Sequence, residues 1–544
     1  MIYSISKGKL IFPFTLLFTL IIGVNISKAQ VSLLKDMNPG SLNSMPDAAH
    51  AIKLNNIIYF TATDSAHGTE LWRTDGSYTG TYLVKDIFPG STNSGIGQLL
   101  SDSILLYFFA KIDSSNRYTL WKSDGTESGT IPIKSNLYSP RGAAFSNHQL
   151  IWICRDTTNY PQLWVSDGTS NGTFAILTNQ IDSNLNSLGE IFTFNNKFYF
   201  TNFNNNLDID NIWLSDGTTN GTKQVLFKNK KQPFIYASNF IVSNDKFFFI
   251  ANDVNHGGEL WLSDGTDTGT YMIKDINAGK LSSSIQPLSL VGGILYFTAD
   301  DGKTGSELWR CDGTESGTIL VKDIHPGTKG SNISPGLFKA INNQLYFSAR
   351  IAFPHLWKSD GTENGTIQLT EKDCDTSGFG SAGYLELNSI LYLFSGNNIT
   401  YADEIWESNG TKEGTFMIND LSKVLPSNYL NYKYSFGTIG TSLLFAAQDS
   451  LHGIELWKYN TITGVHSNFT PIHFEIFPNP TAGKLIISTD SKMNHTEVTV
   501  YNIMGEPVLK TTSLSLDISN QPKGLYFVRV ESELGTTTKK VVVE

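Results

Sequence analysis

Short runs of consecutive apolar residues, separated by Gly, Asp and Pro, recur along most of the chain. Residues 287–324, for example, divide into four such runs: PLSLVGG, ILYFTAD, ELWRCDG and TILVKDI. β-Branched and aromatic residues dominate the runs, which predicts four short β-strands. Because apolar residues follow one another rather than alternate with polar ones, both faces of each strand are expected to be covered. Four strands in about 48 residues match the size of a β-propeller blade.

One tryptophan in each ELW-like run marks a repeat of this unit. The marker residues are Trp72, Trp121, Trp164, Trp213, Trp261, Trp309, Trp357, Trp406 and Trp457. They lie 43 to 51 residues apart and define copies 1 to 9 in chain order. Such regular spacing is typical of a ring or solenoid rather than of separate domains. We therefore predict an all-β protein in which residues 30–470 form a β-propeller of about nine four-stranded blades.

The two ends of the repeat region complement each other. Residues 31–40, VSLLKDMNPG, match the fourth run of a repeat and its following loop, but no ELW precedes them. Copy 9, IELWKYNTITG, follows its Trp with a degenerate turn. The N-terminal strand is therefore expected to close the ring as the outer strand of copy 9, which removes an open sheet edge. Residues 464–469 are the alternative source of that strand.

Asp-Gly follows the third run of most copies, in the motif DGT. The acidic residues are Asp75, Asp124, Asp167, Asp216, Asp264, Asp312 and Asp360, and Asn409 replaces them in copy 8. Asp and Asn bond to the backbone two residues on, and Gly accepts positive φ, so the motif predicts a tight turn. The Asn replacement favours this structural role over acid–base chemistry. Cys311 stands in copy 6 where other copies have Ser or Thr, and is predicted to be a small buried residue rather than a nucleophile.

A second motif, Asp-x-x-His-Gly, precedes the third run in copies 1, 5 and 9. Its residues are Asp64 and His67, Asp253 and His256, and Asp449 and His452. Antiparallel strands place these loops on the same face of the ring as the PGS loops that follow KDI. This face is the candidate ligand-binding surface, and the six residues are its first candidates. The alternative is structural: Asp and His cap the hairpin and bond to the Glu of ELW.

One loop is a candidate metal site. Asn206, Asp208 and Asp210 alternate like the first ligands of a calcium loop, but the Gly and Glu that such loops carry at their sixth and twelfth positions are missing. Calcium is left as an alternative, and no other cofactor is predicted. No HExxH or P-loop pattern occurs in the sequence, no G-x-S-x-G nucleophile elbow is predicted, and no catalytic residue is predicted. A carboxylate pair for glycoside hydrolysis stays open, because acidic residues are plentiful.

Charge and the N-terminus limit the function classes. The formal net charge of -10, with no Lys/Arg cluster, argues against a nucleic-acid partner. Residues 1–29 combine Lys7 and Lys9 with an apolar run and the small-residue pattern Ser27-Lys28-Ala29, which predicts a secretory signal peptide cut after Ala29. No later stretch is long and apolar enough to cross a bilayer, so no transmembrane segment is expected after cleavage.

The pattern changes over residues 471–544. Runs such as KLIIS and YFVRV alternate between apolar and polar residues, which predicts a small β-sandwich. The segment resembles the type A C-terminal sorting domain of the type IX secretion system of Bacteroidetes. The residues that carry the resemblance include Pro478, Asn479, Pro480, Gly505, Gly524 and Tyr526. The resemblance implies handling by the secretion machinery, a route via the periplasm, and a protein that is secreted or attached to the outer surface.

The repeats resemble the ELWxxDGT repeat family, most closely in copies 1, 5 and 6. This resemblance implies a propeller-like fold without a particular activity. We expect a cell-surface or extracellular binding protein that presents loops from many copies to a glycan or a protein. The alternatives are a secreted polysaccharide-degrading enzyme and an adhesin or scaffold for surface attachment. Function is expected in loops that differ between copies, such as SSNRYT at residues 114–119 and RIAFPH at residues 350–355.

Overall fold

The chain forms two compact units, Met1–Thr461 and Ile462–Glu544. The computed structural model describes residues 30–155, 161–176, 187–204, 209–225, 234, 236–253, 255–351, 354–370, 383–396, 403–420, 434–461, 474–489, 497–502, 507–532 and 535–544. The regular secondary structure in these ranges consists of β-strands, so the prediction of an all-β protein is confirmed. The predicted signal peptide lies outside the described residues. Within them, no helix could span a membrane.

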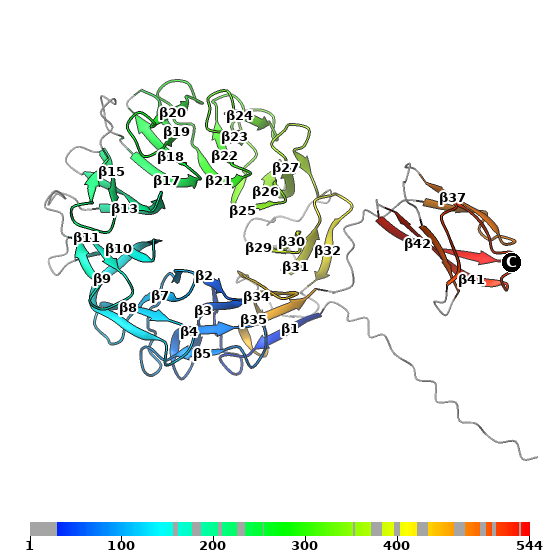
Figure 1. The fold of residues 1–544 in the computed structure, drawn as a ribbon, viewed down its shortest axis with the longest axis horizontal. Coiled ribbons are helices and arrows are strands. Elements are labelled where there is room, and N and C mark those ends of the chain that lie inside the picture. Colours follow the sequence, from blue (N-terminus) through cyan, green and yellow to red (C-terminus); the bar gives the residue numbers. More distant parts are fainter. Residues whose placement is uncertain are drawn as a thin grey trace, which may run out of the picture. The chain divides into compact units, whose positions relative to one another are not determined.

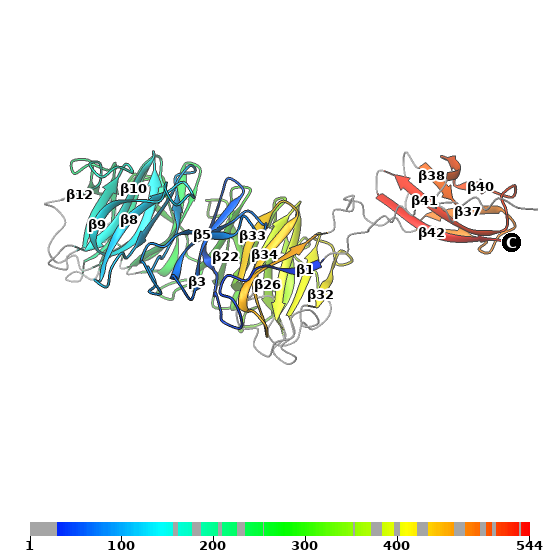
Figure 2. The same cartoon turned by 90° about the horizontal axis from the view of Figure 1, so that it is seen from below.

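Six sheets of the first unit each contain four antiparallel strands from one copy, paired in chain order. The strands are β2 (Asp47–Leu54), β3 (Ile57–Asp64), β4 (Gly68–Thr74) and β5 (Tyr82–Lys85) in copy 1; β13 (Ser187–Phe194), β14 (Lys197–Asn204), β15 (Ile209–Ser215) and β16 (Lys223–Gln224) in copy 4; β17 (Tyr236–Ser243), β18 (Lys246–Asp253), β19 (Gly257–Ser263) and β20 (Tyr271–Lys274) in copy 5; β21 (Gln286–Val291), β22 (Ile294–Asp300), β23 (Ser306–Cys311) and β24 (Ile319–Lys322) in copy 6; β25 (Ser334–Ile341), β26 (Gln344–Arg350), β27 (Pro354–Ser359) and β28 (Ile367–Gln368) in copy 7; and β29 (Tyr384–Leu387), β30 (Ile390–Gly396), β31 (Asp403–Ser408) and β32 (Thr415–Asp420) in copy 8. Figure 1 shows the sheets arranged around a common centre, with the first strand of a copy innermost. Figure 2 shows the same strands running between the two faces of the ring, where the loops gather.

Copies 2 and 3 share one seven-stranded sheet instead of forming two separate ones. In sheet order, its strands are β12 (Phe174–Ile176), β11 (Pro161–Ser166), β10 (Gln149–Arg155), β9 (Ile131–Ser146), β8 (Arg117–Ser123), β7 (Leu106–Ala110) and β6 (Leu100–Ser101). The first half of β9 pairs with β8 of copy 2, and its second half pairs with β10 of copy 3. One long strand therefore serves both copies, which the sequence pattern does not predict.

The N-terminal strand β1 (Gln30–Lys35) pairs antiparallel with β35 (Gly453–Asn460) of copy 9, with Leu33 opposite Trp457. The same sheet continues with β34 (Ser442–Asp449) and β33 (Tyr434–Ile439). This is the outer position that the sequence predicts for the N-terminal strand. Residues 464–469, the alternative source of that strand, lie outside the described residues.

Neighbouring sheets pack face to face. Between copies 5 and 6, Phe248 and Leu260 share one buried cluster with Phe297 and Trp309. In β22, five consecutive residues are buried, because one face packs on the preceding sheet and the other on the following sheet. This explains why apolar residues are consecutive in the repeat. Each large apolar side chain so buried contributes about 1.5–3 kcal/mol.

The second unit consists of two sheets around one core. One sheet contains β36 (Phe474–Phe477), β37 (Lys484–Thr489) and β40 (Ser515–Asp517), and the other contains β39 (Pro507–Thr511), β38 (Glu497–Tyr501), β41 (Gly524–Ser532) and β42 (Gly535–Val543). Ile476 and Leu485 from the first sheet are buried together with Val498 and Val528 from the second. Alternate residues of β36 are buried and exposed, as expected for a strand with one wet face.

Candidate functional site

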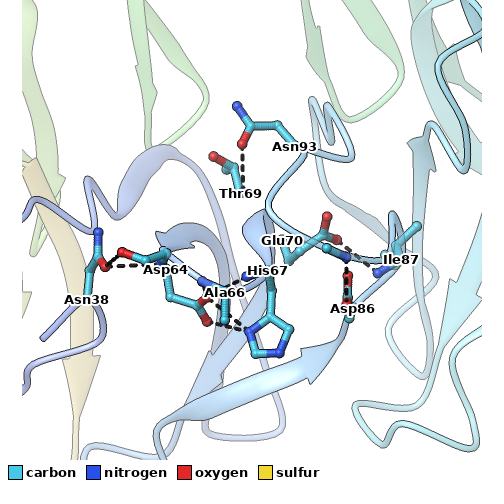
Figure 3. A network of polar contacts seen from close by, with 11 residues as sticks. Asn38, Asp64, Ala66, His67, Thr69, Glu70, Asp86, Ile87 and Asn93 are labelled. Atoms are coloured by element: carbon cyan, nitrogen blue, oxygen red, sulfur yellow. Dashed lines mark hydrogen bonds and ion pairs between the residues drawn. The ribbon is translucent and has the colours of Figure 1, made fainter.

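The Asp-x-x-His-Gly loops pair their own Asp and His side chains. In copy 1, Nδ1 of His67 lies 2.8 Å from Oδ2 of Asp64, and the backbone N–H of His67 donates to Oδ1 of Asp64 at 2.7 Å (Figure 3). The corresponding side-chain distances are 2.8 Å between His256 and Asp253 and 2.7 Å between His452 and Asp449. The hydrogen bond to Asp64 raises the pKa of His67 above its ordinary value. Each Asp therefore caps its own hairpin.

The three Asp–His pairs do not converge on one metal ion. They belong to three separate sheets, at the hairpins β3–β4, β18–β19 and β34–β35. The described residues contain no group of three side chains that could hold a metal. Of the candidate calcium ligands, Asn206 and Asp208 lie outside the described residues, and Asp210 lies in β15 with only its backbone described.

The Glu of ELW binds the loop that follows KDI. Oε2 of Glu70 accepts the N–H of Ile87 at 3.1 Å (Figure 3). Its Oε1 accepts the N–H of Ser94 at 3.1 Å. Glu70 is fully buried. The same two backbone N–H contacts recur from Ile276 and Ser283 to Glu259 and from Met37 and Ser44 to Glu455. In copy 6 the backbone donors to Glu307 are Ile324 and His325, and Ser331 donates its hydroxyl. One carboxylate in each of these copies satisfies donors that the loop would otherwise bury without partners.

The Gly of Asp-x-x-His-Gly allows the loop after KDI to pack closely against the start of the third strand. Gly68 has a φ of +70°, and a Cβ at this position would lie 2.7 Å from the carbonyl carbon of Thr92. Ser94 donates its N–H to the carbonyl oxygen of Thr69 at 3.2 Å, and its own carbonyl oxygen accepts the N–H of Lys111 at 2.7 Å. Thr69 belongs to copy 1 and Lys111 to copy 2, so the loop links two neighbouring sheets. We call this arrangement of Gly, Glu and Ser a joint.

The N-terminal segment forms the same joint with copy 9. Ser44 donates its N–H to Oε1 of Glu455 at 3.1 Å, although the two residues are 411 positions apart. The carbonyl oxygen of Ser44 accepts the N–H of Thr63 in copy 1 at 2.8 Å. A Cβ on Gly453 would lie 2.6 Å from the carbonyl oxygen of Leu42. The contact between the two ends of the repeat region thus copies the contact between ordinary neighbours.

Burial raises the pKa of the joint carboxyls. The pKa of Glu70, Glu259 and Glu455 rises from 4.5 to about 7, and that of Glu307 is raised as well. Loss of hydration is the largest cause, and the hydrogen bonds from the loop oppose it. Asp86 adds a smaller repulsion near Glu70. The joints therefore contain groups that titrate close to neutral pH.

The DGT motif forms a tight turn. Oδ1 of Asp312 accepts the backbone N–H of Thr314 at 2.9 Å and its hydroxyl at 2.7 Å, and these bonds lower the pKa of Asp312. Asn409 accepts the same two bonds from Thr411, at 2.9 and 2.8 Å. Cys311 is buried, and burial raises the pKa of its thiol. A carboxylate and an amide therefore serve the turn equally.

Two cavities have linings that differ from the repeated contacts. One, of about 390 Å³, includes Trp406 and Phe416 of copy 8 in its lining. The other, of about 140 Å³, includes Phe109, Tyr118 and Arg141 from the shared sheet of copies 2 and 3. Tyr118 belongs to the copy-specific segment SSNRYT, but the structure places it in β8 rather than in a loop, and no motif indicates its role. Arg141 is not predicted from sequence, because its position depends on the course of β9 from one copy into the next.

The sorting residues of the second unit gather at the last strand. Nδ2 of Asn479 donates to the carbonyl oxygen of Lys540 at 2.9 Å, and Oδ1 accepts the N–H of Val542 at 3.0 Å. The hydroxyl of Tyr526 donates to the carbonyl oxygen of Pro522 at 2.7 Å. Pro478 and Pro480 flank Asn479, Gly524 begins β41, and Gly505 lies outside the described residues. The fold thus brings the segment Pro478-Asn479-Pro480 against residues 540–542 of β42.

Comparison with known families identifies the tail. A family model described as a secretion system C-terminal sorting domain matches residues 475–544. This agrees with the resemblance in the sequence and confirms a type IX sorting domain at this end of the chain. The match implies export by the type IX machinery, with secretion or attachment at the cell surface. A comparison with curated protein sequences found no match.

Solved structures similar to this chain include several with propellers or peptidase activity in their descriptions. A puromycin hydrolase is 11% identical with a TM-score of 0.38, over 77% of this chain and 61% of the hydrolase. A prolyl endopeptidase is 11% identical with a TM-score of 0.40, over 68% of this chain and 55% of its own. The β-propeller domain of the Trilobed protease from Pyrococcus furiosus is 13% identical with a TM-score of 0.33, over 60% of this chain and 97% of the domain. The chain spans about three fifths of the length of the hydrolase, and likenesses this weak assign no activity.

Proposed function

We propose that this protein is an exported binding protein, whose ring presents copy-specific loops to a glycan or a surface protein. The observation that carries the proposal is the sorting domain at residues 475–544, which directs the chain to the cell exterior. In the proposed route, the leader at residues 1–29 takes the chain to the periplasm. The type IX machinery of Bacteroidetes then moves the chain across the outer membrane.

The proposed scaffold is a closed ring of nine blades over residues 30–470. Strand β9 contributes to two of the blades, and β1 completes the last one. The pairing of β1 with β35 and the joint between Ser44 and Glu455 support closure. In a closed ring the loops keep fixed relative positions, which favours simultaneous contacts with a large ligand.

The structural roles of the repeated residues support binding through the loops that vary between copies. The recurring Asp and Asn residues of DGT hold turns, the Glu residues hold joints, and the Asp–His pairs cap hairpins. These side chains are engaged with their own scaffold. Recognition is therefore assigned to positions at which one copy differs from the others.

A glycan array tests the proposal. The full chain is applied to immobilised polysaccharides and to cell-surface protein extracts, with and without calcium, and any bound polymer is assayed for cleavage. We expect binding without product formation. Release of oligosaccharides would replace the proposal by the polysaccharide-degrading enzyme, and a chain that captures neither glycans nor proteins would contradict it.

A further inference from the structure

Copy 2 cannot form a joint with copy 3, because it carries the wrong residues. Counting back from the marker Trp, Arg117 and Thr119 stand where copy 1 has Gly68 and Glu70. A side chain at the Gly position would collide with a packed loop, since even a Cβ on Gly68 would lie 2.7 Å from loop backbone. Thr119 brings no carboxylate to bind loop N–H groups, and its hydroxyl donates to Ser135 at 3.2 Å instead.

The chain takes a shorter path at this point and leaves a cavity. Copies 2 and 3 are 43 residues apart, the shortest interval in the series, and β9 runs directly from one copy into the other. The cavity of about 140 Å³ lies between the start of copy 2 at Gly95, the hairpin at Tyr118, and β9 at Arg141. Tyr118 is the second residue of β8, next to the hairpin loop that precedes the third strand, and Gly95 lies in the loop after KDI. Loops of these two kinds form the candidate ligand-binding face. The cavity is thus found where other copies have a joint.

The cavity combines aromatic side chains with positive charge. Phe109 and Tyr118 line it, and Nζ of Lys111 lies 5.2 Å from the centre of the Tyr118 ring. Arg141 is an exposed residue, and its guanidinium donates a hydrogen bond to the carbonyl oxygen of Leu188 at 3.3 Å. A bond that fixes the side chain but leaves donors free prepares it for an anionic ligand.

The surrounding charge is unusual for this chain. The β7–β8 hairpin carries Lys111 in its loop and Arg117 at the start of β8, but its loop has only one carboxylate, Asp113, which accepts the N–H of Ser115 at 2.8 Å. Arg141 adds a further positive charge on the facing strand. The whole chain has a formal net charge of -10, so this local excess of cations is not a general property of its surface. These positive charges are therefore expected to attract an anion to the cavity.

We propose that this cavity binds a single sugar unit that carries a carboxylate or a sulfate group, as part of an acidic polysaccharide. The acidic group is recognised by Arg141 and Lys111, and the apolar part of the sugar contacts Tyr118 and Phe109. The volume of the cavity agrees with a ligand of this size. Drug-sized ligands need pockets of roughly 300–1,000 Å³, and this cavity of about 140 Å³ therefore takes a smaller group. The proposal rests on the proposed function and names its ligand.

Titration of the full chain with defined oligosaccharides tests the inference. The probes are oligogalacturonate for the carboxylate, carrageenan oligosaccharides for the sulfate, and mannan oligosaccharides as neutral ligands. We expect one acidic probe to bind and the neutral one not to bind. Arg141→Gln should weaken acidic binding by about tenfold, the loss expected for one charge-assisted hydrogen bond. Raising the salt concentration should weaken it further.

The matched control is Lys303→Gln, which removes an exposed positive charge from the β22–β23 loop of copy 6. This loop corresponds to the β7–β8 loop beside the cavity. Its affinity for the acidic probe should stay within about twofold of the parent chain. Equal weakening by both variants would show a general charge effect and overturn the inference. Binding of a glycan or protein that is indifferent to Arg141→Gln would also overturn it, while leaving the proposed function intact. A chain that binds nothing in any screen would end both.

Discussion

Copies 1, 5, 6 and 9 and the fused pair of copies 2 and 3 are built from the same repeat, yet they differ at two positions. The first group has Gly and Glu around the start of its third strand, and a loop is locked there by a buried carboxylate. Copy 2 has Arg117 and Thr119 at these positions, and a cavity is present instead. The comparison teaches that the joint and the candidate binding site occupy equivalent positions, and that the cavity combines the loss of the Gly–Glu pair with the short interval spanned by β9.

The largest effect is expected from Gly257→Val in copy 5. Gly257 has a φ of +67°, and a Cβ there would lie 2.6 Å from the carbonyl oxygen of Leu281. Strain and collision together should lower the free energy of unfolding by more than about 3 kcal/mol. The urea midpoint measures the loss. Arg117→Val, at the equivalent position of copy 2, should cost less than about 1 kcal/mol, and equal losses would contradict the distinction between the copies.

A smaller but more local effect is expected from Glu455→Ala, which removes the carboxylate that holds the N-terminal segment. The N–H groups of Met37 and Ser44 lose a buried acceptor, at a cost of about 2–3 kcal/mol. Hydrogen exchange should therefore become faster at these two residues. Glu404→Ala is the control, because Glu404 bonds the indole of Trp406 in its own strand. If both substitutions left exchange at Ser44 unchanged, the joint would not hold the segment.

The joints also predict how stability depends on pH. The carboxyls of Glu70, Glu259 and Glu455 have a pKa of about 7 in the folded chain and 4.5 when unfolded. Between these values the unfolded chain has released protons that the folded chain retains, so raising the pH favours unfolding. We expect a higher melting temperature at pH 5 than at pH 8. Glu259→Gln should flatten this slope, whereas Glu315→Gln, on an exposed turn, should leave it unchanged.

The smallest effect is expected from Asp312→Asn in the DGT turn of copy 6. Asn409 makes the same two bonds in copy 8 as Asp312 makes in copy 6, so the amide should replace the carboxylate at a cost below about 0.5 kcal/mol. Thermal unfolding measures the difference. A large loss would show that the charge of the repeated Asp matters, and would reopen a chemical role for these residues.

The strands, their order and the DGT turns could be predicted from sequence because their determinants are local. The joint could not, because Glu70 and its partner Ser94 are 24 residues apart and no regular pattern connects them. A signal was nevertheless present: four of the five copies that carry this Glu also have Gly two residues before it, and the exception is copy 8, with Ala402 before Glu404. The cavity near Arg141 is harder still to foresee, since it arises from the absence of a joint and from the path of a strand through two copies.

The pairing of Leu33 with Trp457 has a consequence for assembly. Strand β1 precedes all the copies, but its partner is complete only when copy 9 has been made. Closing so long a stretch of chain is an entropic cost that must be met before the contact forms, so this pairing is expected late in folding. A chain that stops before copy 9 leaves β1 unpaired and uncovers the apolar faces of copies 8 and 1, and both features favour association with other chains. Synthesis of the last copy thus decides whether the polypeptide closes on itself or associates with its neighbours.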